Sequence, residues 1–215
     1  MEIMKYSQNI KSGIYLVVDP SMPEEILLSK LDQIKQEKIV AIQIWDNFAA
    51  NQEVEALIVK ISALTDQAHI PLLINNRWEL AQILPLQGVH FDEIPVNFSQ
   101  IKNNIGRLII MGLTCNNDLE QVRWAAENNM DYISFCSMYP SSTANSCALV
   151  DFETVIKAKE IFKKPIFLAG GINPKNVKEI NKLQCDGIAV VSGILSAENP
   201  VTSVQAYYKE LKLKI

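Results

Sequence analysis

The strongest constraint on the fold of this chain is an alternation of short apolar runs and longer amphipathic segments, which repeats eight times along 215 residues. The short runs are rich in β-branched residues and nearly free of polar ones, which is typical of parallel strands buried on both faces. We predict strands over residues 14–18, 40–44, 71–74, 88–91, 108–112, 132–135, 166–169 and 187–191.

The segments between these runs have the apolar spacing of helices that pack one face against a sheet. Asn117 and Asp118, for example, stand where a helix that begins at Leu119 needs its N-terminal cap. We predict helices over residues 23–36, 52–68, 78–84, 99–103, 119–128, 152–162, 176–182 and 201–211.

Repeated strand–helix units form either a closed barrel or an open, doubly wound sheet, and the count of eight favours the barrel. The sequence therefore predicts an α/β fold with a single domain, a (β/α)8 TIM barrel over residues 13–215 that follows an N-terminal extension of residues 1–12. In such barrels the loops at the carboxyl ends of the strands build the site, commonly with a phosphate pocket after strands seven and eight.

Charge and composition narrow the classes of partner. The formal net charge is −4, and nucleic-acid binding needs a basic surface, so we expect no nucleic-acid partner. The first residues lack the apolar stretch of a signal peptide and no apolar run has membrane-spanning length, so we expect a cytoplasmic protein without membrane contact. The four cysteines lack metal-site spacing and are expected to be reduced thiols. A small anionic ligand remains compatible with these features.

Two short loops without side-chain bulk follow the last two predicted strands. Gly170 and Gly171 follow the seventh strand, and Ser192 and Gly193 follow the eighth. Paired glycines let main-chain N–H groups approach a phosphate closely, although they also make tight turns. Because both loops occur where a barrel places its phosphate pocket, we predict that they bind phosphate.

Polar residues occur at the ends of several other predicted strands. Each has a structural alternative: Gln43 could be a satisfied core amide, Asn75 and Asn76 could form a turn, and His90 could be a packed histidine. Asp92, beside Glu93, could hold Mg²⁺ or cap the next segment. The candidate residues at these strand ends are Gln43, Asn75, Asn76, His90, Asp92 and Thr114.

The order of the strand-end motifs resembles that of thiamine phosphate synthases and of their relatives, the thiazole tautomerases. The resemblance begins near residue 13 and covers the rest of the chain. The motifs are Ile14 to Asp19, Gln43, Ile74-Asn75-Asn76-Arg77, Gly88-Val89-His90, Gly112-Leu113-Thr114, Tyr139-Pro140-Ser141-Ser142-Thr143, Ala169-Gly170-Gly171-Ile172 and Val190 to Ile194.

The resemblance implies an enzyme of thiamine biosynthesis, a transferase that joins hydroxymethylpyrimidine diphosphate to hydroxyethylthiazole phosphate and releases pyrophosphate. It implies Mg²⁺ as cofactor, with Asn76 and Asp92 as the candidate ligands, and it leaves a homodimer open. The implied catalytic residues are Gln43, Asn75 and Thr114. The implied substrate-binding residues are Gln43, Asn75, Asn76, His90, Thr114, Ser141 and Thr143, with Gly170, Gly171, Ser192 and Gly193 on the thiazole phosphate.

The chain departs from the family motif where the diphosphate is expected to bind. Trp45 and Asn47 replace an Arg and a Lys, Ala144 replaces a Lys, and Asn76 replaces an Asp. If each lost contact to the leaving pyrophosphate costs about 2 to 4 kcal/mol in the transition state, the three missing cations slow the reaction by several orders of magnitude. Two alternatives therefore stay open.

The first alternative is a thiazole tautomerase-like enzyme, which needs no diphosphate site. The proton-transfer histidine of that family aligns with Asn116, so His90 or Cys115 would have to replace it. The second alternative is a non-catalytic protein that binds a thiazole or thiamine phosphate. The Ser-rich segment 137–150 is either a lid over the site or a surface loop.

Overall fold

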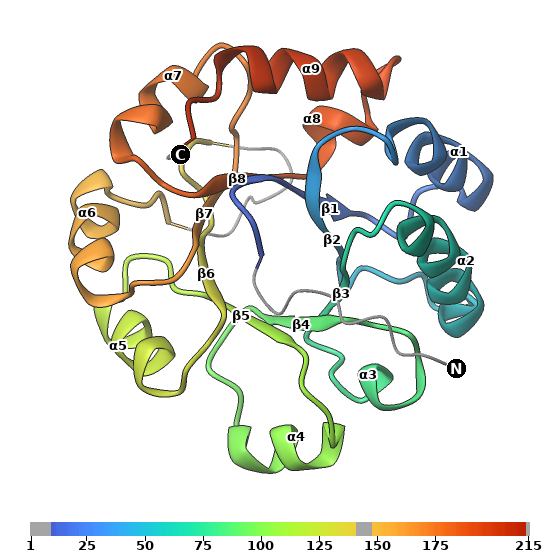
Figure 1. Ribbon diagram of the computed structural model, residues 1–215, viewed down its shortest axis with the longest axis horizontal. Helices are drawn as coiled ribbons and strands as arrows, with labels where there is room; N and C mark the ends of the chain where they lie inside the picture. The colour runs from blue at the N-terminus through green and yellow to red at the C-terminus, as the bar shows by residue number, and fades with distance from the viewer. Residues whose placement is uncertain (1–9, 141–147, 214–215) are drawn as a thin grey trace.

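The structure is a closed barrel of eight parallel strands, in a computed structural model that describes residues 10–140 and 148–213. Each strand pairs with its neighbours in sequence, and β8 closes the barrel against β1 (Figure 1). The predicted TIM barrel is confirmed. The strands are β1 (Gly13–Val18), β2 (Ile39–Ile44), β3 (Leu72–Asn75), β4 (Gly88–Phe91), β5 (Ile110–Thr114), β6 (Tyr132–Phe135), β7 (Ile166–Ala169) and β8 (Gly187–Val190).

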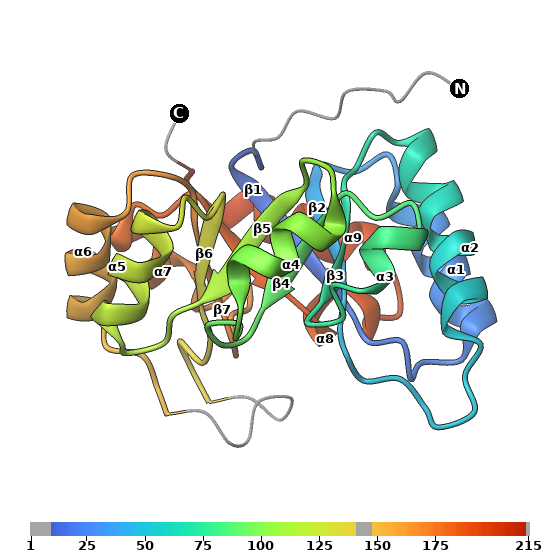
Figure 2. The ribbon, with the colours of Figure 1, turned by 90° about the horizontal axis from the view of Figure 1, so that it is seen from below.

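Helices surround the barrel on the outside (Figure 1). In the side view of Figure 2, α8 and the loop after β2 both lie toward the lower edge. In the described residues no helix is both long and apolar enough to span a membrane. The helices are α1 (Glu24–Ile34), α2 (Val54–Gln67), α3 (Leu80–Ile83), α4 (Phe98–Ile105), α5 (Leu119–Glu127), α6 (Phe152–Ile161), α7 (Val177–Ile180), the 3₁₀ turn η1 (Asn181–Leu183), α8 (Ser192–Leu195) and α9 (Pro200–Glu210).

Several element bounds differ slightly from the sequence-based prediction, and two of the differences have a clear structural cause. Strand β5 begins two residues later, because its register opposes Gly88 of β4 to Ile110 and leaves Leu108 outside the sheet, 81% exposed. Helix α8 occupies part of the predicted glycine loop after β8. The predicted cap of α5 is confirmed, because the Asp118 carboxylate accepts hydrogen bonds from two N–H groups of its first turn.

Three aromatic rings pack in the barrel interior, beside aliphatic side chains such as Leu73 and Ile110. Tyr15, Tyr132 and Phe167 pack with ring centroids 5.5 to 5.8 Å apart, in a buried cluster separate from the apolar layer under the helices. A Cβ at Gly112 would lie 2.0 Å from Tyr132 Cζ, so this strand position leaves the space that the ring occupies. Ile10, in the predicted N-terminal extension, belongs to the same interior cluster. The rings form a floor beneath the carboxyl ends of the strands.

Candidate active site

A cavity of about 730 Å³ opens above this aromatic floor, at the carboxyl ends of the strands. Tyr15, Tyr132 and Phe167 line its base. A volume of this size suits one small organic ligand. Of the residues predicted from sequence, those that line the cavity are Gln43, Asn75, His90, Asp92, Thr114 and Gly170.

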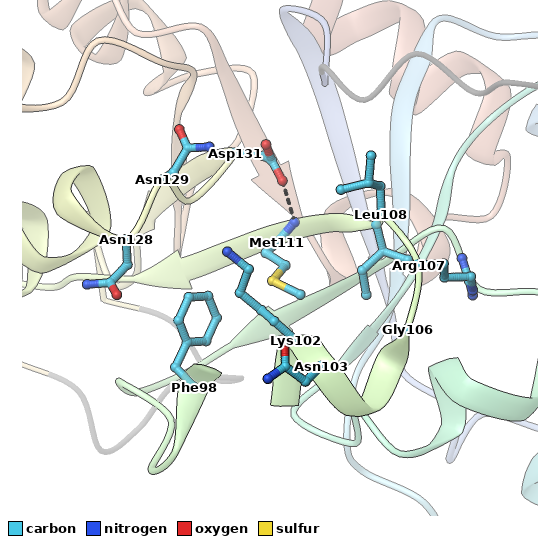
Figure 3. Close-up of a pocket in the computed structure, with 11 residues that line it drawn as sticks. Phe98, Lys102, Asn103, Gly106, Arg107, Leu108, Met111, Asn128, Asn129 and Asp131 are labelled. Carbon is cyan, nitrogen blue, oxygen red and sulfur yellow. Dashed lines mark hydrogen bonds between the residues drawn. The ribbon is translucent and has the colours of Figure 1, made fainter. Parts of the chain in front are cut away.

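A second cavity, of about 500 Å³, lies at the opposite, amino-terminal edge of β5 and β6 (Figure 3). Lys102 and Asp131 line it, but the Asp131 carboxylate already accepts a hydrogen bond from the Met111 N–H at 2.8 Å. Burial raises the pKa of Asp131. Because the amino-terminal face of such barrels serves stability rather than chemistry, we take the first cavity as the candidate site.

Gln43 is held at the cavity by the two buried tyrosines. The Tyr15 hydroxyl donates to Gln43 Oε1 at 2.8 Å and lies 2.7 Å from the Tyr132 hydroxyl. No acceptor among the described residues takes the Gln43 Nε2 protons. The two interpretations of Gln43 therefore both hold, since one side of its amide is satisfied in the core and the other faces the cavity.

His90 is a buried histidine with both ring nitrogens in contact with hydroxyl groups. Its Nδ1 lies 2.8 Å from the Tyr132 hydroxyl, and its Nε2 lies 2.8 Å from Thr114 Oγ1. Thr114 in turn lies 3.1 Å from Ser134 Oγ. Burial lowers the pKa of His90 to about 4, against the opposing effect of the Asp92 carboxylate. His90 is therefore neutral at pH 7, and the packed interpretation of this residue is the one that the geometry supports.

Asn75, Asn76 and Asp92 form a cluster at the cavity rim. Asn75 Nδ2 donates to Asp92 Oδ1 at 3.0 Å, and Asn76 Nδ2 donates to Asp92 Oδ2 at 2.9 Å. The Asp92 N–H donates back to Asn76 Oδ1 at 3.0 Å, and Asn76 has a left-handed φ of 57°. Asn76 therefore faces Asp92, and it does not line the cavity.

The two cation positions that the structure describes carry uncharged side chains, Trp45 and Asn47. Trp45 lines the cavity, whereas Asn47 Nδ2 donates to Asp19 Oδ1 at 3.0 Å. Arg77, the nearest arginine in sequence, pairs with Asp46 at 2.6 Å and lies over the Phe48 ring. Among the described residues that line the cavity there is no Lys or Arg, and the charged ones are Asp92, Glu93 and Asp118.

The glycine loops after β7 and β8 are tightly packed. Gly170 and Gly171 have φ values of 87° and 63°, and a Cβ on Gly170 would lie 2.3 Å from Ser137 N. A Cβ on Gly193 would lie 2.2 Å from the Tyr207 hydroxyl, which donates to Ile172 O in the other loop. Of the four predicted phosphate residues only Gly170 lines the cavity, so phosphate binding stays a prediction. Ser141, Thr143 and Ala144 lie outside the described residues.

Several cavity residues were missed in the sequence. Tyr15, Tyr132 and Ser134 are ordinary strand formers, and they were read only as parts of apolar runs. Their signal was the two-residue period of a strand, which puts Tyr132 and Ser134 on the same inward face. Asn116 and Gln121 also line the cavity, on the loop and helix that follow β5.

The sequence comparisons with known proteins show one family. A family model described as thiamine monophosphate synthase matches residues 14–194. A thiamine-phosphate synthase of Methanobrevibacter smithii is 27% identical over 209 residues, 96% of this chain and 98% of the relative. Thiamine-phosphate synthase 1 of Aquifex aeolicus is 33% identical over 202 residues, 92% and 93% of the two chains. A solved thiamine phosphate pyrophosphorylase from Pyrococcus furiosus matches with a TM-score of 0.80 at 24% identity, covering 94% of this chain and 96% of that chain, which supports the fold.

We predict that His90 makes the fold sensitive to acid. Its pKa in the fold, about 4, lies below the ordinary value of 6.5, so the unfolded chain takes up the proton first as the pH falls. The contribution of His90 to the free energy of unfolding is complete above pH 6.5 and is lost toward pH 4, by roughly 3 kcal/mol in total.

Urea unfolding between pH 7.5 and pH 4.5 measures this effect. His90→Gln should flatten the pH dependence, whereas His69→Gln, at an exposed turn, should leave it as in the wild type. An unchanged slope in His90→Gln would show that carboxylates alone cause the acid sensitivity.

Proposed function

The chain belongs to the thiamine monophosphate synthase family, and on this premise we propose that it makes thiamine phosphate from hydroxymethylpyrimidine diphosphate and hydroxyethylthiazole phosphate. The observation that carries the proposal is the convergence of Gln43, Asn75 and Thr114, from β2, β3 and β5, on one cavity. These are the positions that the family resemblance assigned to the reaction.

In the proposed reaction the thiazole nitrogen forms a bond to the pyrimidine methylene carbon while the bond from that carbon to the diphosphate oxygen breaks. The Gln43 amide and the Thr114 hydroxyl bind and orient the pyrimidine. Positive charge develops at the methylene carbon, and the carboxylate of Asp118, which also lines the cavity, favours it electrostatically. Pyrophosphate leaves with the negative charge, so the site also needs a counter-charge for this group.

Mg²⁺ is the proposed counter-charge, and the residues present fit it in one way. No group of three or more His, Cys, Asp or Glu residues that could hold a metal occurs in the described part of the chain. Mg²⁺ needs less, because it commonly binds one or two carboxylates together with substrate phosphates and water. Asp92 and Glu93 would hold the ion, with the Asn76 amide as a weaker neighbour. The ion would neutralise charge on the leaving pyrophosphate.

The proposal extends to the thiazole phosphate and to the setting of the enzyme. Gly170 and Gly171 would bind the phosphate through main-chain N–H groups, which have no acceptor among the described residues, and Ser192 and Gly193 would complete the pocket. We assign the chain to the cytoplasm, where both phosphorylated substrates are soluble, and include a homodimer as an assembly to be measured.

A non-catalytic binder of thiamine phosphate is the second candidate, and the acidic cavity with Trp45 at its wall favours it. The tautomerase alternative has less support. Both nitrogens of His90 contact hydroxyl groups, and Cys115 is buried in the outer apolar layer, where burial raises its pKa to about 12. Neither residue is available to transfer a proton in the cavity.

Incubation of the purified chain with both substrates tests the proposal. We expect thiamine phosphate and pyrophosphate in equal amounts, and no product after chelation of Mg²⁺, since the cavity offers no cation in its described lining. Binding of thiamine phosphate without turnover would establish the binder instead. Isomerisation of the thiazole without metal would establish the tautomerase.

We predict that restored cations accelerate the synthase reaction. Trp45→Arg combined with Asn47→Lys and Ala144→Lys returns positive charge to the leaving group, so kcat should rise by at least about tenfold. Steady-state kinetics of pyrophosphate release measure the gain. The matched control is Lys60→Arg with Lys157→Arg on exposed helix faces, which should leave kcat unchanged. A folded triple variant with no gain would contradict the assigned diphosphate position.

We predict that Asn76→Asp increases the response to Mg²⁺. The substitution replaces the donor that lies 2.9 Å from Asp92 Oδ2 with a second carboxylate, and two facing carboxylates repel unless a cation lies between them. The melting temperature should therefore fall without Mg²⁺ and rise more steeply with added Mg²⁺ than in the wild type. If Mg²⁺ raises the melting temperatures of the wild type and of Asn76→Asp equally, Asn76 does not lie beside the metal position.

A further inference from the structure

Six polar side chains form one continuous row inside the barrel. Each is between 1% and 7% exposed, and each touches the next through hydrogen-bonding atoms. Because each hydrogen bond in the row joins one donor to one acceptor, the donors and acceptors must match one another, and the protons in the row can be counted. The row runs through Gln43, Tyr15, Tyr132, His90, Thr114 and Ser134.

The count begins at Gln43. Its Oε1 accepts the only proton of the Tyr15 hydroxyl. Tyr15 must then accept at its 2.7 Å contact with Tyr132, so Tyr132 is the donor there. The proton of Tyr132 is thereby used, so His90 must donate from Nδ1. The hydrogen bond at Gln43 therefore fixes the proton of His90 on Nδ1, although the two residues are not in contact.

The count continues on the other side of the ring. A neutral imidazole with its proton on Nδ1 has only a lone pair on Nε2, so Thr114 donates to it. Thr114 must then accept from Ser134 at their 3.1 Å contact. All five hydrogen bonds point in one direction, from β6 through the floor to β2.

This direction gives the cavity a polarity. At the β2 end, Gln43 presents its two Nε2 protons, whereas at the β5 and β6 end Thr114 and Ser134 have only lone pairs left. Two more acceptors lie at that end: Asn116 Oδ1 and Gln121 Oε1 are buried without a hydrogen-bond partner among the described residues. The two ends of the cavity therefore demand opposite hydrogen-bonding groups from a ligand.

We infer that Tyr15, Tyr132 and His90 are positioning residues, which set Gln43 as a donor and Thr114 and Ser134 as acceptors toward the ligand. The cavity then selects a small heterocycle with a ring acceptor toward β2 and an N–H donor toward β5 and β6. The direction of the row is a property of the protein alone. Its effect on turnover rests on the proposed function.

The protonated nitrogen of His90 tests the direction. The chain has two histidines, so long-range ¹⁵N–¹H NMR of the full-length protein, with His69→Gln for assignment, identifies the His90 tautomer. We expect the proton on Nδ1. A proton on Nε2 would reverse every hydrogen bond in the row and overturn the inference.

Substitutions at Gln43 test whether the row transmits its direction. Gln43→Glu offers Tyr15 only acceptors and should keep the His90 proton on Nδ1. Gln43→Lys offers only donors and should move that proton to Nε2, although the two side chains do not touch. An Nδ1 proton in a folded Gln43→Lys variant would show that the tautomer is set elsewhere. If this variant does not fold, a change of tautomer in Gln43→Glu would contradict the inference equally.

A double-mutant cycle tests the effect on turnover. Tyr15→Phe should lower kcat/KM about tenfold in the wild type but less than about twofold in Gln43→Leu, because Tyr15 acts through Gln43. Tyr208→Phe, which removes a hydroxyl bonded to Ile14 N and Lys38 O at the amino ends of the strands, should leave kcat/KM unchanged. If Tyr15→Phe lowers kcat/KM equally in the wild type and in Gln43→Leu, Tyr15 has only a structural role.

If no synthase activity is found, the same cycle is measured on the dissociation constant for thiamine phosphate. Coupling in that constant would support the positioning role while the proposed function fails. Additive effects there would overturn the role as well.

Discussion

The contact between the hydroxyls of Tyr15 and Tyr132, 2.7 Å across the barrel interior, supports both the core and the site. Barrels of this kind usually fill their centre with branched aliphatic side chains. Here two phenols share the centre with Phe167 and aliphatic side chains, and each buried hydroxyl would cost about 1 to 3 kcal/mol without a partner. The two hydroxyls hydrogen-bond to each other. Tyr15 also hydrogen-bonds to Gln43, and Tyr132 also hydrogen-bonds to His90. The packing of the floor and the polarity of the cavity therefore both depend on this interaction.

The electrostatics of the site follow from a local exchange of partners. At one family cation position Asn47 donates a hydrogen bond to Asp19, and the nearby Arg77 pairs with Asp46, so neither side chain brings positive charge to the cavity. The cavity retains carboxylates in its described lining, without Lys or Arg. An acidic cavity favours positive charge on a bound ligand and disfavours a bare diphosphate. The proposed Mg²⁺, arriving with the diphosphate, would reconcile the two demands.

The sequence predicted the barrel because buried parallel strands leave an unambiguous apolar pattern, and it predicted Gln43, Asn75 and Thr114 because polar residues at strand ends interrupt that pattern. It misplaced β5, whose start depends on pairing with β4. It missed Tyr15 and Tyr132 because a tyrosine in a strand looks like packing. The turn of Asn76 toward Asp92 depends on a left-handed backbone, which no spacing in the sequence reveals.

The proposed phosphate pocket uses glycines that packing between two loops also requires. Gly170 and Gly171 have no room for a Cβ against the segment after β6, and Gly193 has none against Tyr207, so packing alone requires glycine at these positions. That packing also joins the loops after β7 and β8, because Tyr207 donates to Ile172 O. The N–H groups of Gly170 and Gly171 remain without acceptors in the described chain. Tight packing therefore holds free donors in place, which is the arrangement that an anion needs.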